Sequence, residues 1–112
     1  MRKLLVPILV AGLLGPVAVP AVAATKNVTV GDNYFVRDGG VPKVKVAKNT
    51  RVKWVWRGKS VHNVKVTRGP AMFGSRIMTK GSYAKKVTRK GTYTLVCTVH
   101  GAGDQSMKLV VK

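Results

Sequence analysis

Apolar and polar residues alternate with a period of two along much of the chain. Five stretches show the alternation: residues 43–47, 51–57, 61–67, 92–98 and 107–112. Because successive side chains of a β-strand point to opposite faces, each stretch predicts a strand with one apolar face and one basic or polar face. No stretch has a sustained helical period. The pattern therefore predicts antiparallel sheets that pack face to face, each with one solvated side.

Turn-forming residues separate these stretches at short intervals. Examples are Gly31-Asp32-Asn33, Asp38-Gly39-Gly40, Arg68-Gly69-Pro70 and Gly101-Ala102-Gly103. Short strands bounded by such turns, over roughly 90 residues, predict an all-β fold, a small sandwich of seven or eight strands. The sequence contains no internal repeat and no linker, so we expect residues 25–112 to form one domain.

The first 24 residues differ from the rest of the chain. Met1, Arg2 and Lys3 form a short basic start, residues 4–24 carry no charge, and the stretch ends in small residues. This pattern is typical of a secretory signal peptide, here residues 1–24, cleaved at an Ala-Val-Ala or Val-Ala-Ala box. The alternative is an uncleaved anchor, since about 20 apolar residues can span a bilayer. Prolines and glycines disfavour that helix, so we expect export to the periplasm or the extracytoplasmic cell envelope, with no membrane span after cleavage.

The chain is strongly basic. It has 21 Lys and Arg against 3 Asp and Glu over 112 residues, a formal net charge of +18. Cleavage would remove two basic side chains and leave +16 on 88 residues. The cations are spread over solvent-facing strand positions without an aromatic stacking motif or a groove-entering helix, so specific nucleic-acid binding is not expected. The alternatives are a solvated basic surface and docking on an acidic redox protein or an anionic envelope surface.

The side chains that suit a transition metal are concentrated in two segments. The chain has one cysteine and two histidines, and all three lie within residues 60–64 or 93–107. His62 and Cys97 are on the apolar parity of their strands, and His100 begins a glycine-rich loop. A thiolate, two imidazoles and a weak fourth donor form the ligand set of blue copper electron-transfer sites. Metal binding would also use a thiol that is otherwise at risk in an oxidising compartment.

These residues have two other interpretations besides a metal site. A lone buried histidine or cysteine is usually an ordinary core residue. A cysteine beside a histidine can also be the nucleophile and base of a hydrolase, which needs a third, orienting group and a substrate cleft. The chain has three carboxylates and we expect none of them near His62, so we do not expect an enzyme.

The chain from about residue 26 to residue 112 resembles the plastocyanin-like cupredoxins, which are small secreted blue copper proteins. The resemblance is carried by His62-Asn63-Val64 and by the run Gly91-Thr92-Tyr93-x3-Cys97-x2-His100. It implies a Greek-key β-sandwich of two sheets with one type 1 copper ion at one end. It also implies that the equatorial ligands are His62, Cys97 and His100.

The fourth ligand departs from the usual pattern of that family, a methionine three to five residues after the second histidine. Those positions are Gly103, Asp104 and Gln105, while Met107 comes seven residues after His100. The resemblance makes Gln105 the axial ligand if the last strand keeps its register, and Met107 if the loop is longer. We favour Gln105, which has the plastocyanin-type spacing and the inward parity. Glutamine is the axial ligand in stellacyanin-like relatives, and its amide oxygen should lower the reduction potential.

The resemblance implies a monomeric electron carrier that cycles between Cu(I) and Cu(II) without turning over a substrate. By the same analogy, electrons would pass through the loop-borne His100, and Asn63 would join the two ligand loops by hydrogen bonds. The alternative function is copper storage, delivery or sensing in the cell envelope with the same fold and ligands. A metal-free module that binds anionic polymers is a further possibility, against which the intact His–Cys–His set argues.

Overall fold

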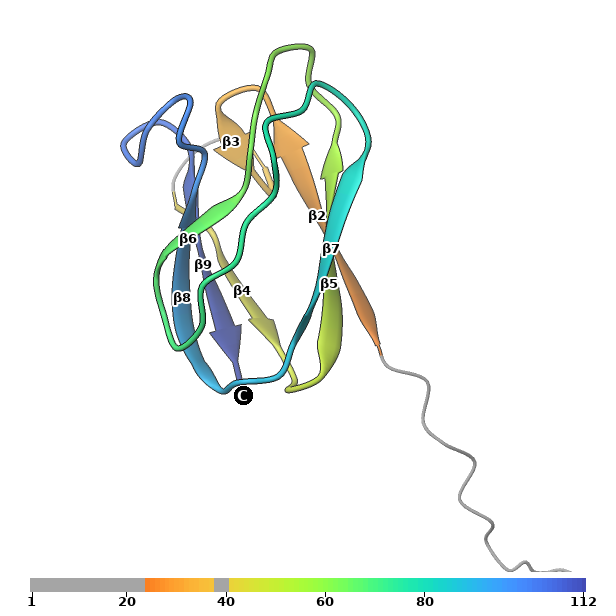
Figure 1. Ribbon diagram of the computed structural model, residues 1–112, viewed down its shortest axis with the longest axis vertical. Helices are drawn as coiled ribbons and strands as arrows, with labels where there is room; N and C mark the ends of the chain where they lie inside the picture. Colours follow the sequence, from red (N-terminus) through yellow and green to blue (C-terminus); the bar gives the residue numbers. More distant parts are fainter. Residues whose placement is uncertain (1–23, 38–40) are drawn as a thin grey trace, which may run out of the picture.

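The computed structural model describes residues 24–37 and 41–112, which form eight strands in two sheets packed face to face (Figure 1). This confirms the predicted all-β sandwich of seven or eight strands. These two ranges include no helix, and therefore none with the length and hydropathy to cross a membrane. The predicted signal peptide, except for Ala24, lies outside the described residues.

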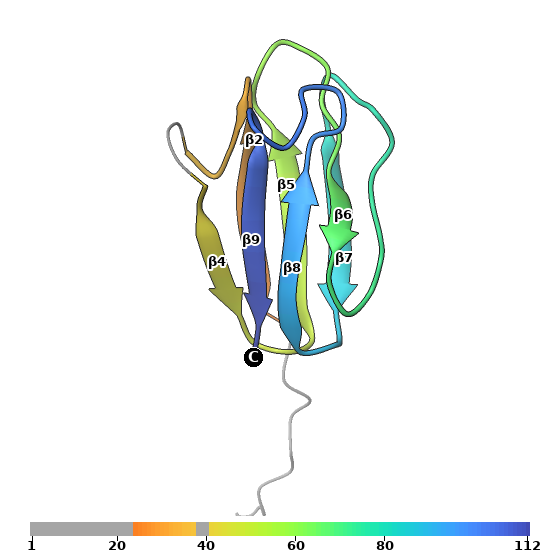
Figure 2. The same ribbon diagram turned by 90° about the vertical axis from the view of Figure 1, so that its left-hand side faces the viewer.

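Each sheet has four strands. The first has the order β3-β2-β5-β7, made of β2 (Thr25–Gly31), β3 (Tyr34–Phe35), β5 (Thr50–Trp56) and β7 (Ser82–Val87). The second has the order β4-β9-β8-β6 and faces the viewer in Figure 2. Its strands are β4 (Lys43–Val46), β6 (Lys65–Arg68), β8 (Gly91–Val96) and β9 (Ser106–Val111). From β3 to β8, each successive strand lies in the opposite sheet.

Both sheets are mixed, which corrects the expectation of antiparallel sheets. The pairs β2–β5 and β4–β9 are parallel, and the other four pairs are antiparallel. After β3 the chain crosses to the second sheet to form β4 and then returns to the first as β5, which runs in the direction of β2. Alternating polarity reports which face of a strand is buried, and it carries no information on the direction of the neighbouring strand.

The core lies between the sheets and is built from the inward positions of the strands. In β5 the side chains of Val52, Trp54 and Trp56 are buried, while the two residues between them, Lys53 and Val55, are half-buried. Trp54 stacks on Tyr83 of β7 with ring centroids 5.7 Å apart. The indole Nε1–H of Trp54 donates to the sulfur of Met107 on β9 at 3.5 Å, so Trp54 also connects the two sheets.

The segment before β6 does not follow the predicted period of two. The strand expected over residues 61–67 begins only at Lys65, and His62, Asn63 and Val64 are all buried. Three consecutive buried side chains are incompatible with a strand that has one solvated face. His62 instead forms an isolated bridge with Met78, with a backbone hydrogen bond of 2.9 Å in each direction.

Candidate metal centre

The cysteine and both histidines meet at one end of the sandwich. In Figure 1 the loops that follow β2, β5 and β8 lie together at the end opposite the C-terminus. Cys97 directly follows β8, His100 lies in the next turn, and His62 belongs to the segment between β5 and β6. One potential ligand atom from each of the three residues lies within 4.8 Å of the others. The fold therefore brings together three side chains that the sequence places in two separate segments.

The sulfur of Cys97 faces both imidazoles. It lies 3.3 Å from His100 Nδ1 and 3.9 Å from His62 Nδ1. Cys97 and His62 have no exposed surface, whereas His100 is half-buried. A thiolate with two imidazole nitrogens suits copper better than it suits hard cations, which prefer oxygen ligands.

Backbone hydrogen bonds close the loop that carries Cys97 and His100. Gly101 N–H donates to the carbonyl of Cys97 at 2.8 Å, and Gln105 N–H donates to the carbonyl of Gly101 at 3.0 Å. Gly101 has φ of 88°, a left-handed conformation that glycine adopts without steric cost. The amide of Cys97 donates in turn to the carbonyl of Gln105 at 3.0 Å, so the loop returns Gln105 to the side of Cys97.

The Gln105 amide is buried and has a defined orientation. Its Nε2 donates to the carbonyl oxygens of Gly31 at 2.9 Å and Tyr34 at 2.8 Å. Because carbonyl oxygens only accept, the NH₂ group must occupy this side of the amide. The opposite atom, Oε1, is buried without a hydrogen-bond partner. An unsatisfied buried acceptor costs about 1–3 kcal/mol, so a cation that binds this oxygen would relieve the cost.

Met107, the other axial candidate from the sequence, lies within β9. It is the register partner of Leu95 on β8 and is fully buried. Its sulfur accepts the indole N–H of Trp54. Of the two candidates, Gln105 has an unpartnered donor atom, while Met107 has a sulfur that is already engaged in the core.

A carboxylate that sequence reasoning missed contacts His62. Asp32 Oδ1 lies 2.8 Å from His62 Nε2, so the expectation of no carboxylate near His62 is wrong. The two residues are 30 positions apart, and only the folding of the β2–β3 turn against the loop after β5 brings them together. The hydrogen bond from His62, followed by backbone N–H bonds from Lys59 and Ser60, holds the pKa of Asp32 well below its usual value. In the sequence, only the position of Asp32 in the predicted turn Gly31-Asp32-Asn33 set this residue apart.

Hydrogen bonds join the two ligand-bearing segments. Asn63 Oδ1 accepts the backbone N–H of Thr98 at 2.8 Å, and Asn63 Nδ2 donates to Thr98 Oγ1 at 3.0 Å. This is the connection that the resemblance implied for Asn63. In addition, Trp56 Nε1–H donates to the carbonyl of His62 at 3.1 Å, which fixes the backbone on the other side.

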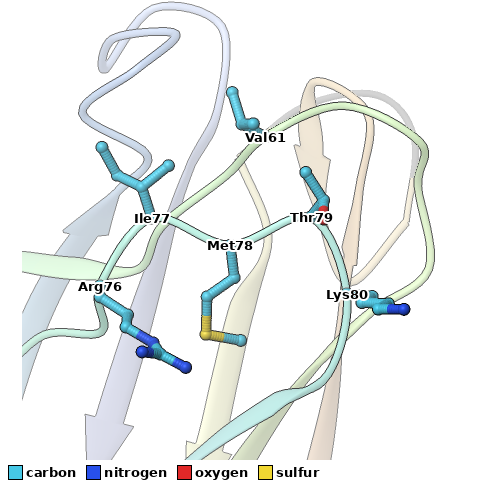
Figure 3. Close-up of a pocket in the computed structure, with 6 residues that line it drawn as sticks. All are labelled: Val61, Arg76, Ile77, Met78, Thr79 and Lys80. Atoms are coloured by element: carbon cyan, nitrogen blue, oxygen red, sulfur yellow. The ribbon is translucent and has the colours of Figure 1, made fainter.

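A shallow depression of about 420 Å³ lies beside the centre and is lined by Val61 and residues 76–80. Its side chains do not converge: Val61 and Ile77 point upward in Figure 3, whereas Arg76 and Met78 point downward. Cys97 is not part of its lining. The depression therefore gives the thiol no substrate cleft of the kind that a cysteine hydrolase needs.

Two packed sheets with a His–Cys–His group at one end define a cupredoxin-like fold, with a site consistent with a blue copper protein. No protein-family model matches the sequence. No curated protein matches it significantly either.

The solved structures that resemble the chain include several of amicyanin. The oxidised form of a methionine-to-leucine variant shares 26% identity with a TM-score of 0.65, over 78% of this chain and 81% of that one. The Cu(I) form of a methionine-to-glutamine variant shares 27% identity with a TM-score of 0.66, over 80% and 83%. Together with the cluster of His62, Cys97 and His100, these copper-protein neighbours indicate a type 1 copper site.

Proposed function

We propose that this chain is an exported blue copper protein that carries single electrons between redox partners. The observation that carries the proposal is the meeting of one buried thiol with two imidazole Nδ1 atoms at one end of a cupredoxin-like sandwich. One bound copper ion would supply a one-electron Cu(I)/Cu(II) couple. We assign the equatorial ligands as His62, Cys97 and His100.

The protein's own residues would keep the donor atoms in place and dry. Cys97 is enclosed and its backbone is tied to Gln105, so the sulfur has little freedom to move. His62 is held from two sides, by Trp56 at its carbonyl and by Asp32 at its Nε2. His100 is the one histidine with exposed surface, which supports its role as the route for electrons.

We assign the axial position to Gln105. Its amide is held by two carbonyls so that Oε1 lacks a partner, whereas the sulfur of Met107 accepts a hydrogen bond from Trp54. An amide oxygen is a harder donor than a thioether, so this ligand would favour Cu(II) and lower the reduction potential.

The remaining parts of the proposal depend on the sequence. Residues 1–24 would be a cleaved signal peptide and residues 25–112 the copper domain, located in the periplasm or the extracytoplasmic envelope as a monomer. The domain would not be an enzyme. The charge of +16 on the mature chain supports docking on an acidic redox protein or an anionic envelope surface, and its salt dependence should be strong.

The experiment that tests the proposal is the addition of Cu(II) to the purified protein. We expect an intense visible thiolate-to-Cu(II) charge-transfer band and a reversible one-electron potential. Cys97→Ser should abolish the band because it removes the thiolate, while the core control Met107→Leu should retain it. A wild-type protein without the band contradicts the assignment. Transfer of copper to a copper-free acceptor protein added to the solution, together with slow electron self-exchange, would instead support the storage or delivery alternative.

A further inference from the structure

The hairpin formed by β2 and β3 contacts two of the four proposed ligands. Gly31 and Tyr34 are register partners, so Asp32 and Asn33 form a two-residue turn, with φ of 66° at Asn33. The carbonyls that flank the turn accept the Gln105 amide, and the turn itself presents the Asp32 carboxylate to His62. One short element therefore orients ligands that come from two distant parts of the chain.

The loop after β5 is folded around the Asp32 carboxylate. Asp32 Oδ1 accepts the Ser60 hydroxyl at 2.9 Å and the backbone N–H groups of Lys59 and Ser60, both at 3.0 Å. Gly58 leaves the space that the carboxylate occupies, because a Cβ at this position would overlap Asp32 Oδ1. Such a built set of donors holds the carboxylate in one place against the ring of His62.

The contact determines which nitrogen of His62 is free. A neutral imidazole has one N–H and one lone pair. Asp32 can only accept, so the proton of the ring lies on Nε2, and the lone pair lies on Nδ1, which faces Cys97. A carboxylate on the far nitrogen of a metal-binding histidine also makes the ring a stronger donor.

We propose that Asp32 is a positioning residue of the metal centre, which keeps His62 in the tautomer that binds through Nδ1 and favours the oxidised ion over the reduced one. This inference rests on the proposed copper function. Asp104 provides the matched comparison. It is a second carboxylate at the same end, but it is exposed, and its side chain makes no hydrogen bond to a ligand within the described ranges.

The first test measures how strongly the protein prefers Cu(II) to Cu(I). Loss of a residue that supports a metal ligand typically costs 10–100-fold in affinity. We expect Asp32→Asn to reduce the Cu(II)/Cu(I) affinity ratio about tenfold, which is about 59 mV for a one-electron couple. Asp104→Asn removes the same charge and should change the ratio by much less. Equal shifts in Asp32→Asn and Asp104→Asn would overturn the proposal.

The second test reads the tautomer of His62 without copper. The ¹⁵N shifts of its ring, measured by NMR at alkaline pH, should show the proton on Nε2 in the wild type and in Asp104→Asn. Asp32→Ala should shift part of the population to the other tautomer, and Asp32→Leu, which has a similar shape and no acceptor, serves if the alanine variant does not fold. An unchanged tautomer in a folded variant refutes the positioning role. This readout separates the two proposals, because a wild type without a blue band would refute the copper function alone.

Discussion

The Gln105 amide shows how single atoms can distinguish candidates that spacing along the chain leaves open. Spacing from His100 permitted Gln105 or Met107 as the axial ligand. The structure adds that two carbonyls fix the NH₂ side of Gln105, and that Trp54 occupies the sulfur of Met107. Because the oxygen of Gln105 has no partner and the sulfur of Met107 has one, substitutions of these two residues should affect the copper site differently.

We predict that Gln105→Met raises the reduction potential. The thioether is a softer and weaker donor than the amide oxygen, so it stabilises Cu(II) less. A rise of at least about 59 mV, equivalent to a tenfold change in the Cu(II)/Cu(I) preference, is the expected scale in voltammetry.

Met107→Leu is the matched control for this change. It keeps the buried volume and should leave the potential unchanged, at a cost of less than about 1.5 kcal/mol in the free energy of unfolding. If Met107→Leu moves the potential and Gln105→Met does not, the axial assignment passes to Met107.

At the scale of elements, the centre depends on contacts between segments that belong to different strands. Asn63 belongs to the segment before β6 and Thr98 to the loop after β8, and two strong hydrogen bonds join them. Asn63 is buried, with 6% of its surface exposed, whereas Thr98 lies at the surface.

We predict that Asn63→Ala lowers the free energy of unfolding of the copper-free protein by about 1–3 kcal/mol, because it removes two hydrogen bonds to Thr98, each of which contributes about 0.5–1.5 kcal/mol. Urea unfolding measures the change. Thr98→Ala retains the N–H bond to Asn63 and should cost less. The copper-loaded Asn63→Ala protein should also release its ion faster to a chelator. Equal stability of the two variants would mean that the backbone bond is not what joins the segments.

The sequence predicted the elements whose two faces differ clearly in polarity. Alternation located β4, β5, β8 and β9 because their inward residues are apolar and their outward ones are mostly basic or polar. It did not locate β7, in which Tyr83 and Ala84 are both half-buried and Lys85 occupies an inward position at an edge. The contact of Asp32 with His62 could not be predicted from the sequence either, because it depends on how a turn folds over another loop.

At the scale of the whole molecule, the charges are distributed unevenly. The eight strands carry ten lysines and arginines and no acidic residue. The two carboxylates of the described residues, Asp32 and Asp104, both lie in loops at the metal end. Lys43 and Lys108 are register partners on adjacent strands, so two cations stand side by side on the outer face of the second sheet. An arrangement of like charges is unfavourable by itself and becomes favourable against an anionic surface.

We predict that Lys43→Ala with Lys108→Ala weakens binding to anionic lipid vesicles by about 2 kcal/mol, or roughly 30-fold, since each cation near such a surface contributes about 1 kcal/mol. Sedimentation with vesicles at several salt concentrations measures the effect. Thr92→Ala lies on the same face without a charge and should bind like the wild type. Vesicle binding that does not fall as salt rises would contradict an electrostatic origin, and the basic strands would then have no part in docking.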